Sequence, residues 1–520
     1  MRACAAGGLP GALADPEVRV AKSAQGPWTD PVAAAARRRR SLALLALAAA
    51  LGSACSGAPA RRPPPRRPPE TVLKSEGDER RAGADMSKEV EAEFGLVEDA
   101  ALVAYVTEIG TRLARFAPPR DFDYHFRIVD QDAPNAFALP GGQIYVSRGL
   151  LLLANTEDEL ANVIGHEIVH AALRHASARQ AMIESFPGIL QIMAAGAIAS
   201  YSRDQEREAD RVGQQLAARA GYDPEAMAGF LKQLDYSERL RFGSSRLPGF
   251  FDTHPSTRDR VAEASARARA TPWQPVPAIA PGHDGYLRRI DGLAVGTRAS
   301  EGVFQKDRFL HAELDLSLRF PEGWETRNSR AAVGAISPNH DAQVVLELQG
   351  KGDDPQAAVE EYLASDEAIG LGLDGPPQPV RLGPIEAVRA TGGARTPAGP
   401  LKVHLTWIAY GGNIYRLTGI AASGLSEKYE GVFRSTARSF RPLTERERDS
   451  IQEMRLRLAE AQSGESLSAL SERTRNRWDV QQTAVMNDVF ADAPLSESQL
   501  VKIAVLEHYT ATPQAEPAAR

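Results

Sequence analysis

The stretch His166-Glu167-Ile168-Val169-His170 combines residue types that can carry out hydrolytic chemistry. Residues four apart on a helix lie just over one turn apart, so His166 and His170 would project from the same face. Two imidazoles placed in this way can bind one tetrahedral zinc ion. Glu167 would then lie beside the metal, where a carboxylate can accept the proton of an attacking water. The pattern therefore indicates zinc-dependent hydrolysis with Glu167 as the general base, and a chance occurrence on a core helix is the alternative.

A third metal ligand is offered by the charged helical stretch from Ser202 to Asp210. Glu206 and Asp210 are four residues apart and share a helix face, so one carboxylate can bind the metal. The other can hydrogen-bond a ligand histidine from outside the coordination sphere. We assign Glu206 as the third ligand and Asp210 as the orienting carboxylate. A solvated charged helix face is the alternative interpretation.

Several predicted elements must position these residues. Between about Gly83 and Pro118 apolar residues recur at helical spacing and predict helices that pack against the histidine-bearing helix. The sequence AFALPGGQIYVS predicts a hairpin whose turn is Pro140-Gly141-Gly142. Asn155-Thr156 followed by three acidic residues marks the start of the histidine-bearing helix, which we expect to run to about Ser185.

Two further features near the histidines have structural interpretations. His175 lies roughly on the ligand face, five residues beyond His170, but helix geometry disfavours a third metal contact from one helix, so we interpret it as structural. The apolar segment PGILQIMAAGAIAS, residues 187–200, is too short to cross a membrane. We interpret it as a buried helix; the alternative, implied by the family resemblance described next, is a mobile lid over the site.

Four motifs together resemble the gluzincin zinc metallopeptidases, the family of the CAAX prenyl proteases and the BepA-like periplasmic proteases. They occur in the family's order and are, along the chain, NAFALPGGQIYVSRGLL, HEIVHAALRH, YSRDQEREADRVG and DTHPSTRDR. The resemblance covers residues of about 85 to 270. It implies a mainly helical catalytic domain that binds one zinc ion per chain and cleaves protein substrates.

The resemblance also implies roles for residues outside the two helices. The hairpin would form an edge above the zinc, which makes Asn135, Ala136 and Phe137 candidate substrate contacts. An ordinary hairpin with Phe137 in the core is the alternative. His254 would either occupy the fourth zinc position and keep the enzyme latent, or stabilise the oxyanion. Arg260 would anchor the loop that carries His254 or bind the substrate.

The N-terminal residues predict export. Four arginines at Arg37–Arg40 precede an apolar run and then Cys55, which is the order of a secretory signal. A cysteine at this place resembles a bacterial lipoprotein signal, in which Cys55 is lipidated; a short uncleaved anchor is the alternative. The long leader suggests that translation starts downstream, for example at Val32. Cys4 and Cys55 are the two cysteines, so the body of the chain has no disulfide framework. The net charge of −6 does not suggest a nucleic-acid surface.

The rest of the chain is predicted to contain further domains. A Pro- and Arg-rich tether follows the leader over residues 56–82, and a linker rich in Pro and Gly begins the segment 271–304. Residues 305–442 alternate strands with a helix and predict a mixed α/β domain, for which we expect a role in partner binding or substrate positioning. Residues 443–510 predict a charged helix and then a module that resembles LysM, with Asn487 and Ser498 at two of its positions. Glycan binding and a purely structural cap are both compatible with this end.

The prediction as a whole is a multidomain α+β protein. Its mainly helical HExxH zincin domain, residues 83–270, carries a small edge hairpin and is followed by the mixed α/β domain and the LysM-like module. We predict an exported metalloendopeptidase for misfolded or outer-membrane proteins, lipid-anchored in the periplasm of a Gram-negative bacterium. The alternatives are a chaperone-like assembly factor with a latent zinc site, or a cell-wall scaffold that binds peptidoglycan.

Overall fold

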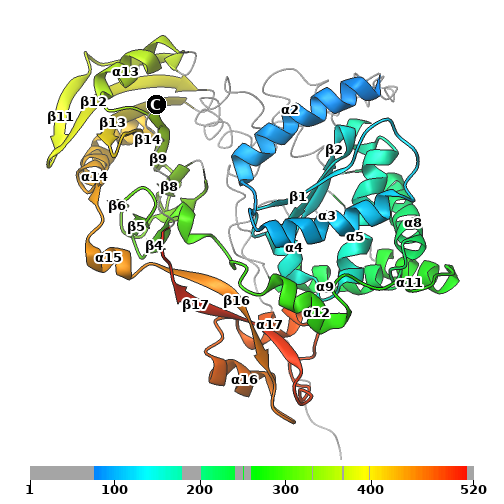
Figure 1. The fold of residues 1–520 in the computed structure, drawn as a ribbon. Helices are drawn as coiled ribbons and strands as arrows, with labels where there is room; N and C mark the ends of the chain where they lie inside the picture. The colour runs from blue at the N-terminus through cyan, green and yellow to red at the C-terminus, as the bar shows by residue number, and fades with distance from the viewer. Residues whose placement is uncertain are drawn as a thin grey trace, which may run out of the picture.

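The computed structural model describes residues 75–178, 201–240, 250, 254, 259–330, 332–365, 368–396 and 399–511. The leader with Cys55, most of the tether and the apolar segment 187–200 lie outside the described residues. Figure 1 shows a mainly helical part, a sheet-rich part beside it, and a C-terminal unit that runs beneath both. This arrangement agrees with the predicted multidomain α+β fold.

The helical part is built from helices around a small sheet. The sheet has the order β1-β3-β2, in which β1 and β3 are parallel while β2 and β3 form the predicted antiparallel hairpin. The elements are α2 Glu76–Phe94, α3 Ala100–Ala114, β1 His125–Val129, β2 Ala136–Leu139, the 3-10 turn η2 Pro140–Gly142, β3 Gln143–Ser147, α4 Arg148–Leu153, α5 Glu157–Ala172, α8 Arg203–Arg219, α9 Ala226–Leu240, α11 Arg260–Ala270 and α12 Gly282–Ile290.

Helix α2 lies across the hairpin turn, as Figure 1 shows. It begins at Glu76, within the stretch assigned to the tether, because Ser75 and Asp78 form a capping box. Two glycines permit the close approach. A Cβ atom on Gly83 would lie 1.9 Å from the carbonyl oxygen of Pro140, and Gly141 has φ 71° and faces the α2 backbone.

Helix α5 carries both histidines of the HExxH motif and is almost entirely buried. Thr156 caps it by accepting a hydrogen bond from the backbone of Glu159, as the sequence predicted. The prediction of one continuous helix is wrong at residues 173–174, and residues 179–185 lie outside the described part of the chain. The helix ends at Ala172, because Arg174 adopts a left-handed conformation with φ 63° that breaks the helical hydrogen-bond pattern.

Helix α8 crosses α5 at a pair of glycines. A Cβ atom on Gly213 would lie 2.9 Å from the backbone nitrogen of His166, and one on Gly165 would lie 3.1 Å from the carbonyl oxygen of Gly213. The absence of side chains at the crossing lets the two backbones touch. The charged face of α8, with Glu206 and Asp210, is thereby brought directly against the histidines.

The sheet-rich part has its own core. Its main sheet has the order β10-β12-β13-β14-β9-β8-β7, and β11 also pairs with β12. Helix α13 packs on one face, where Tyr362 contacts Trp407, and α14 packs on the other, where Phe433 contacts His404. A second sheet has the order β15-β6-β5-β4. The strands and the helix predicted over residues 305–442 are therefore present.

The elements of this part follow the linker. They are η3 Ala299–Glu301, β4 Val303–Gln305, β5 Arg308–His311, β6 Leu316–Arg319, β7 Glu325–Asn328, β8 Ala332–Ile336, β9 Ala342–Lys351, α13 Pro355–Ala364, β10 Leu371–Leu373, β11 Gln378–Leu382, β12 Ile385–Thr396, β13 Gly399–Tyr410, β14 Asn413–Ala422, η5 Ser423–Leu425, α14 Ser426–Arg438 and β15 Arg441–Pro442.

The C-terminal unit consists of a short helix, two antiparallel strands and two helices between the strands. The predicted charged helix is wrong beyond its first turn. Residues 452–460 form a strand because Met454, Leu456 and Leu458 alternate with arginines, which is the period of a strand. The elements are α15 Glu445–Asp449, β16 Gln452–Glu460, α16 Leu467–Thr474, α17 Val480–Met486 and β17 Leu500–His508.

This unit shares its core with the helical part. Leu456, Trp478, Leu500 and Ala504 belong to the same buried cluster as the apolar residues of α3, α4 and α5. Asn487 joins α17 to β17, because its side-chain amide donates to the carbonyl oxygen of Lys502 at 2.9 Å and its oxygen accepts from the Lys502 backbone at 2.7 Å. The resemblance to a LysM module stays a prediction.

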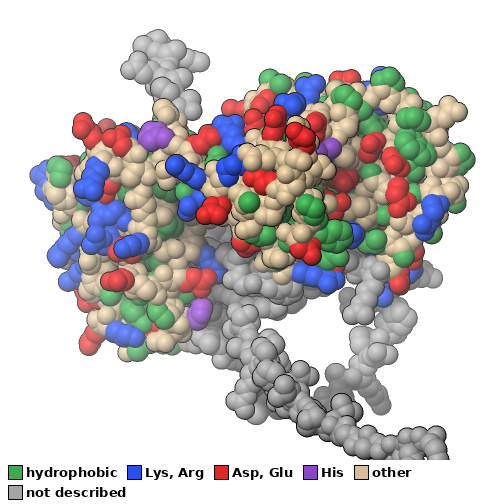
Figure 2. Space-filling view, turned by 90° about the horizontal axis from the view of Figure 1, so that it is seen from below, with side chains coloured by type: hydrophobic (Ala, Val, Ile, Leu, Met, Phe, Trp, Pro, Cys, Tyr) green, Lys and Arg blue, Asp and Glu red, His purple; other side chains and the backbone are tan. Residues whose placement is uncertain are grey.

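The surface mixes charges of both signs. Figure 2 shows acidic and basic side chains interspersed on the face seen from below, with lysine and arginine more frequent over the sheet-rich part. Within the described ranges, every helix is too short or too polar to cross a lipid bilayer.

Candidate active site

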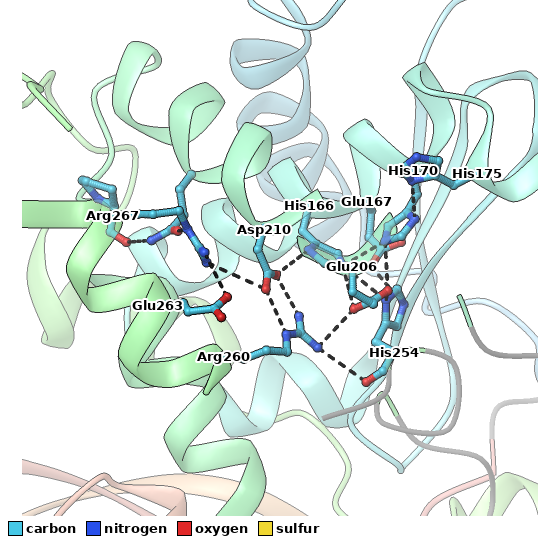
Figure 3. A network of polar contacts seen from close by, with 12 residues as sticks. His166, Glu167, His170, His175, Glu206, Asp210, His254, Arg260, Glu263 and Arg267 are labelled. Carbon is cyan, nitrogen blue, oxygen red and sulfur yellow. Dashed lines mark hydrogen bonds and ion pairs between the residues drawn. The ribbon is translucent and has the colours of Figure 1, made fainter. Parts of the chain in front are cut away.

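Three elements bring the predicted metal ligands together. Helix α5 supplies His166 and His170, helix α8 supplies Glu206, and His254 arrives from the segment before α11 (Figure 3). All four side chains are buried, with exposed fractions of 0 to 2%. Their ligand atoms lie within 4.8 Å of one another, and among the described residues this is the one such group of three or more potential ligands.

The donor set fits zinc in chemistry and in spacing. The Nε2 atoms of His166 and His170 are 3.0 Å apart, and Nε2 of His170 is 3.3 Å from Oε1 of Glu206. Nδ1 of His254 is 3.2 Å from Nε2 of His166 and 2.9 Å from Oε1 of Glu206. A tetrahedron with zinc–ligand bonds of about 2.0–2.1 Å has edges of roughly 3.3 Å, so the four atoms are spaced as zinc ligands.

The position of the proton on His166 supports the assignment of this cluster as a zinc site. Nδ1 of His166 lies 3.0 Å from Oδ1 of Asp210, a carboxylate oxygen that can only accept a proton. The proton of a neutral His166 therefore belongs on Nδ1, which leaves a lone pair on Nε2 directed at the cluster. Converging lone pairs repel each other unless a cation lies between them, which is the arrangement that a metal stabilises.

Glu167 and His254 lie face to face at the edge of the cluster. Both side chains are fully buried, and Nε2 of His254 is 3.4 Å from Oε1 of Glu167. The His254 ring also stacks on Phe250 at 4.2 Å between centroids. His254 thus contacts the predicted general base through one nitrogen and the predicted third ligand through the other. The geometry places it where a fourth ligand would be.

Arg260 clamps the two carboxylates of α8. Its Nε and Nη2 donate to Asp210 at 2.9 and 2.8 Å, and its Nη1 lies 3.1 Å from Oε2 of Glu206 (Figure 3). The same Nη1 donates to the backbone carbonyl of His254 at 3.5 Å. The Arg260 side chain is 3% exposed, so in this arrangement it anchors the His254 segment and does not reach solvent.

Electrostatics keep these carboxylates ionised. Burial works to raise the pKa of Glu206, but the surrounding histidines outweigh it and hold the pKa well below its usual range. Burial likewise opposes ionisation of Asp210, yet Arg260 and His166 lower its pKa. Burial lowers the pKa of His170 well below the ordinary value, so this imidazole is neutral and can offer a lone pair.

Sequence reasoning missed two neighbours of His170. Nδ1 of His175 lies 3.2 Å from Nδ1 of His170, and the Tyr201 ring stacks on the His170 imidazole with centroids 3.7 Å apart. Both residues lie inside the quoted motifs. The sequence argument for His175 concerned only a direct contact with the metal, and nothing in the sequence indicates the Tyr201 contact.

The predicted substrate-contact residues lie on the hairpin. Strand β2 is an edge of the three-stranded sheet and packs against α5. The Phe137 side chain stacks on Tyr145 beneath α2, with ring centroids 5.1 Å apart, and Asn135 is also buried. Contacts from Asn135, Ala136 and Phe137 to a substrate therefore stay a prediction, and in this arrangement they would use the backbone.

Comparisons with known proteins identify the helical part. Residues 100–268 match Peptidase family M48. The "Beta-barrel assembly-enhancing protease" of Escherichia coli (strain K12) is 31% identical over 244 residues, covering 42% of this chain and 49% of that protein. The protein of the same name from Yersinia pestis is 34% identical over 215 residues, covering 36% and 43%. The "Mitochondrial metalloendopeptidase OMA1" of Schizosaccharomyces pombe is 30% identical over 201 residues, covering 35% and 59%.

The fold and the site define a zinc metallopeptidase domain: two crossing helices present His166, His170 and Glu206 around one point, with Glu167 beside it. The match of residues 100–268 to Peptidase family M48 confirms the gluzincin resemblance. The chain spans about half the length of the Escherichia coli relative and somewhat more of the Schizosaccharomyces pombe one.

Proposed function

We propose that the chain is an exported zinc-dependent metalloendopeptidase that hydrolyses peptide bonds of envelope proteins. The observation that supports it best is the position of Glu167, fully buried and adjacent to the point where His166, His170 and Glu206 converge. A carboxylate at this place has the position of a general base.

Each residue has a chemical role in this proposal. Bound zinc would polarise the scissile carbonyl and lower the pKa of the attacking water. Glu167 accepts the proton of that water and passes it to the leaving amine. His166, His170 and Glu206 would hold the metal, while Asp210 fixes the His166 tautomer. Arg260 keeps Asp210 and Glu206 in register with each other.

The location and substrates are proposed from the leader and the relatives. The Arg37–Arg40 run, the apolar stretch and Cys55 support export and lipid anchoring to the outer membrane of a Gram-negative bacterium. Several bacterial relatives are named for enhancing β-barrel assembly, which supports misfolded or outer-membrane proteins as substrates. We therefore propose a role in periplasmic protein quality control.

A latent state of this site is the second candidate, and the contacts of His254 favour it. A catalytic zinc site keeps one position open, whereas a fourth protein ligand closes it. Here His254 fills the group of four and also contacts Glu167. In this reading the chain acts as a chaperone-like assembly factor until the His254 segment moves away.

Two variants of the chain without its leader test these proposals. Glu167→Gln is expected to retain zinc and to lose casein cleavage by at least about 100-fold, because only the base is removed. Unchanged cleavage by this variant would exclude Glu167 as the base. His254→Ala is expected to raise cleavage if His254 closes the site, and to lower it if His254 stabilises the oxyanion.

Peptidoglycan binding by residues 464–505 remains the third proposal. Deleting this segment would not test it cleanly, because Trp478, Leu500 and Ala504 contribute to the core of the peptidase domain. Sedimentation of the intact protein with purified peptidoglycan is the better experiment. Retention in the pellet would support a wall-binding role, and recovery in the supernatant would leave a structural cap.

A further inference from the structure

Nδ1 of the His170 imidazole contacts His175, which in turn contacts Glu208. Nδ1 of His175 lies 3.2 Å from Nδ1 of His170, and Nε2 of His175 lies 3.5 Å from Oε2 of Glu208. Figure 3 shows the His175 ring next to the ring of the metal ligand His170. His175 is 6% exposed, whereas the Glu208 side chain on α8 is 46% exposed.

The order of these groups determines where each proton lies. To bind a metal, His170 must present a lone pair at Nε2, so its proton is on Nδ1. Nδ1 of His175 must then accept that proton in a hydrogen bond, which places the proton of His175 on Nε2. Nε2 of His175 faces the carboxylate of Glu208, which can only accept. Every donor in this order meets an acceptor.

We infer that His175 and Glu208 are positioning residues that fix the tautomer and orientation of His170 as a metal ligand. They would do for His170 what Asp210 does for His166. The inference rests on the proposed metal-binding role of His170. It assigns a task to a histidine that the sequence indicates only as structural.

The break after α5 makes this contact available. On a continuous helix, five residues correspond to a rotation of roughly 500°, so His175 would point about 140° away from His170. Instead the left-handed Arg174 turns the chain. The Arg174 guanidinium is held by the buried carboxylate of Glu79 on α2. The turn is thus fixed from outside the helix, and it directs His175 back toward His170.

The Tyr201 ring completes the restraint. It lies nearly parallel to the His170 imidazole, at 22° and 3.7 Å between centroids. Stacking limits tilting of the His170 plane, while the hydrogen bond that His170 donates to His175 limits its rotation within that plane. Together these contacts would hold the Nε2 lone pair on the line toward Glu206 and His166.

The experiment compares His175→Leu, His175→Gln and the parent in the chain without its leader. Zinc affinity is measured by competition with a chromophoric chelator, and geometry by the visible spectrum of the Co²⁺-substituted protein. His175→Leu is expected to bind zinc about 10- to 100-fold more weakly and to change the Co²⁺ spectrum. His175→Gln is expected to recover most of the affinity, because its side-chain oxygen can accept the proton of His170.

Two further variants serve as controls. His125→Leu replaces an exposed histidine at the start of β1 and should leave both readouts unchanged. Glu208→Gln changes a half-exposed side chain, so it should fold normally while weakening zinc binding by a few-fold. If His175→Leu does not fold, the zinc affinity of Glu208→Gln still tests the inference.

The outcomes separate this inference from the proposed function. Parent-like zinc affinity and Co²⁺ spectrum in His175→Leu, or in Glu208→Gln where only that variant folds, would overturn the inference, as would a Gln variant no better than Leu. A parent that binds no zinc would overturn it together with the metal site. Zinc binding that depends on His175, in a protein that cleaves nothing, would support the inference and remove only the proteolytic function.

Discussion

The two ends of helix α5 both bury ionisable groups, yet they differ in how those groups are paired. At the first turn, Glu157 accepts hydrogen bonds from the backbones of Ile279 and Ala280 and from the Tyr105 hydroxyl. Nearby, the fully buried Lys502 donates to three backbone carbonyls at the end of α4, those of Leu152, Leu153 and Ala154. Each donor meets an acceptor at this end, which therefore supports the fold.

At the other end, His166 and His170 direct their Nε2 atoms at each other and at the Glu206 carboxylate. When both histidines are neutral, acceptors meet acceptors there, and a bound cation would stabilise this arrangement. Burial alone therefore does not identify an ionisable residue as functional. Complementary pairing marks the structural end of α5, and converging lone pairs mark the metal-binding end.

The largest expected effect comes from removing one of the converging acceptors. Glu206→Gln replaces the carboxylate with an amide and should abolish both zinc binding and casein cleavage, because the third ligand loses its charge. Metal analysis of the purified variant is the measurement. Asp204→Asn, on the same helix but 96% exposed, is the matched control and should keep both properties. Stoichiometric zinc in Glu206→Gln would contradict the assignment of Glu206 as a metal ligand.

A change at the structural end should affect stability without affecting the metal site. Lys502→Met removes the donor to three carbonyls, of which that of Leu153 still accepts from Gln233, and should lower the free energy of unfolding by about 2 to 6 kcal/mol. Urea denaturation measures this loss. The folded fraction should still bind one zinc ion. Lys88→Met, at a side chain 77% exposed, should change stability little. Loss of zinc affinity in folded Lys502→Met would mean that the two ends are coupled.

An orienting residue should have an intermediate effect. Asp210→Asn removes the charge that holds the proton on Nδ1 of His166 and should weaken zinc binding about 10- to 100-fold. Competition with a chelator measures the zinc affinity of the variant and of the parent. Zinc affinity equal to that of the parent would show that Asp210 serves only to pair with Arg260.

The smallest expected effect is a dependence on pH in the metal-free protein. Asp210 has a folded-state pKa below its ordinary value, although burial opposes this, because Arg260 and His166 favour the charged form. Its contribution to stability is therefore present above the unfolded pKa of about 3.9 and is lost as the pH falls through the folded value. The stability gap between the parent and Asp210→Asn should be wide at pH 7 and narrow in strong acid. A gap that does not change with pH would contradict this assignment.

Local sequence patterns predict the chemistry of the site and much of the local structure. His166, Glu167 and His170 follow from helical spacing, and Glu206 and Asp210 follow from the same rule on α8. The hairpin and the start of α5 were likewise readable, because turn and capping residues act over a few positions.

Local patterns do not predict which distant groups meet, because those contacts depend on packing between segments far apart in the chain. The approach of α8 to α5 depends on the contact between Gly165 and Gly213. No local sequence pattern predicts this contact. The contact of His175 with His170 depends on a left-handed residue held by Glu79, far away in the chain. The C-terminal unit joins the peptidase core after the whole sheet-rich part has intervened. Sequence periodicity records the face that a segment buries, whereas packing between segments decides the partner on which it is buried.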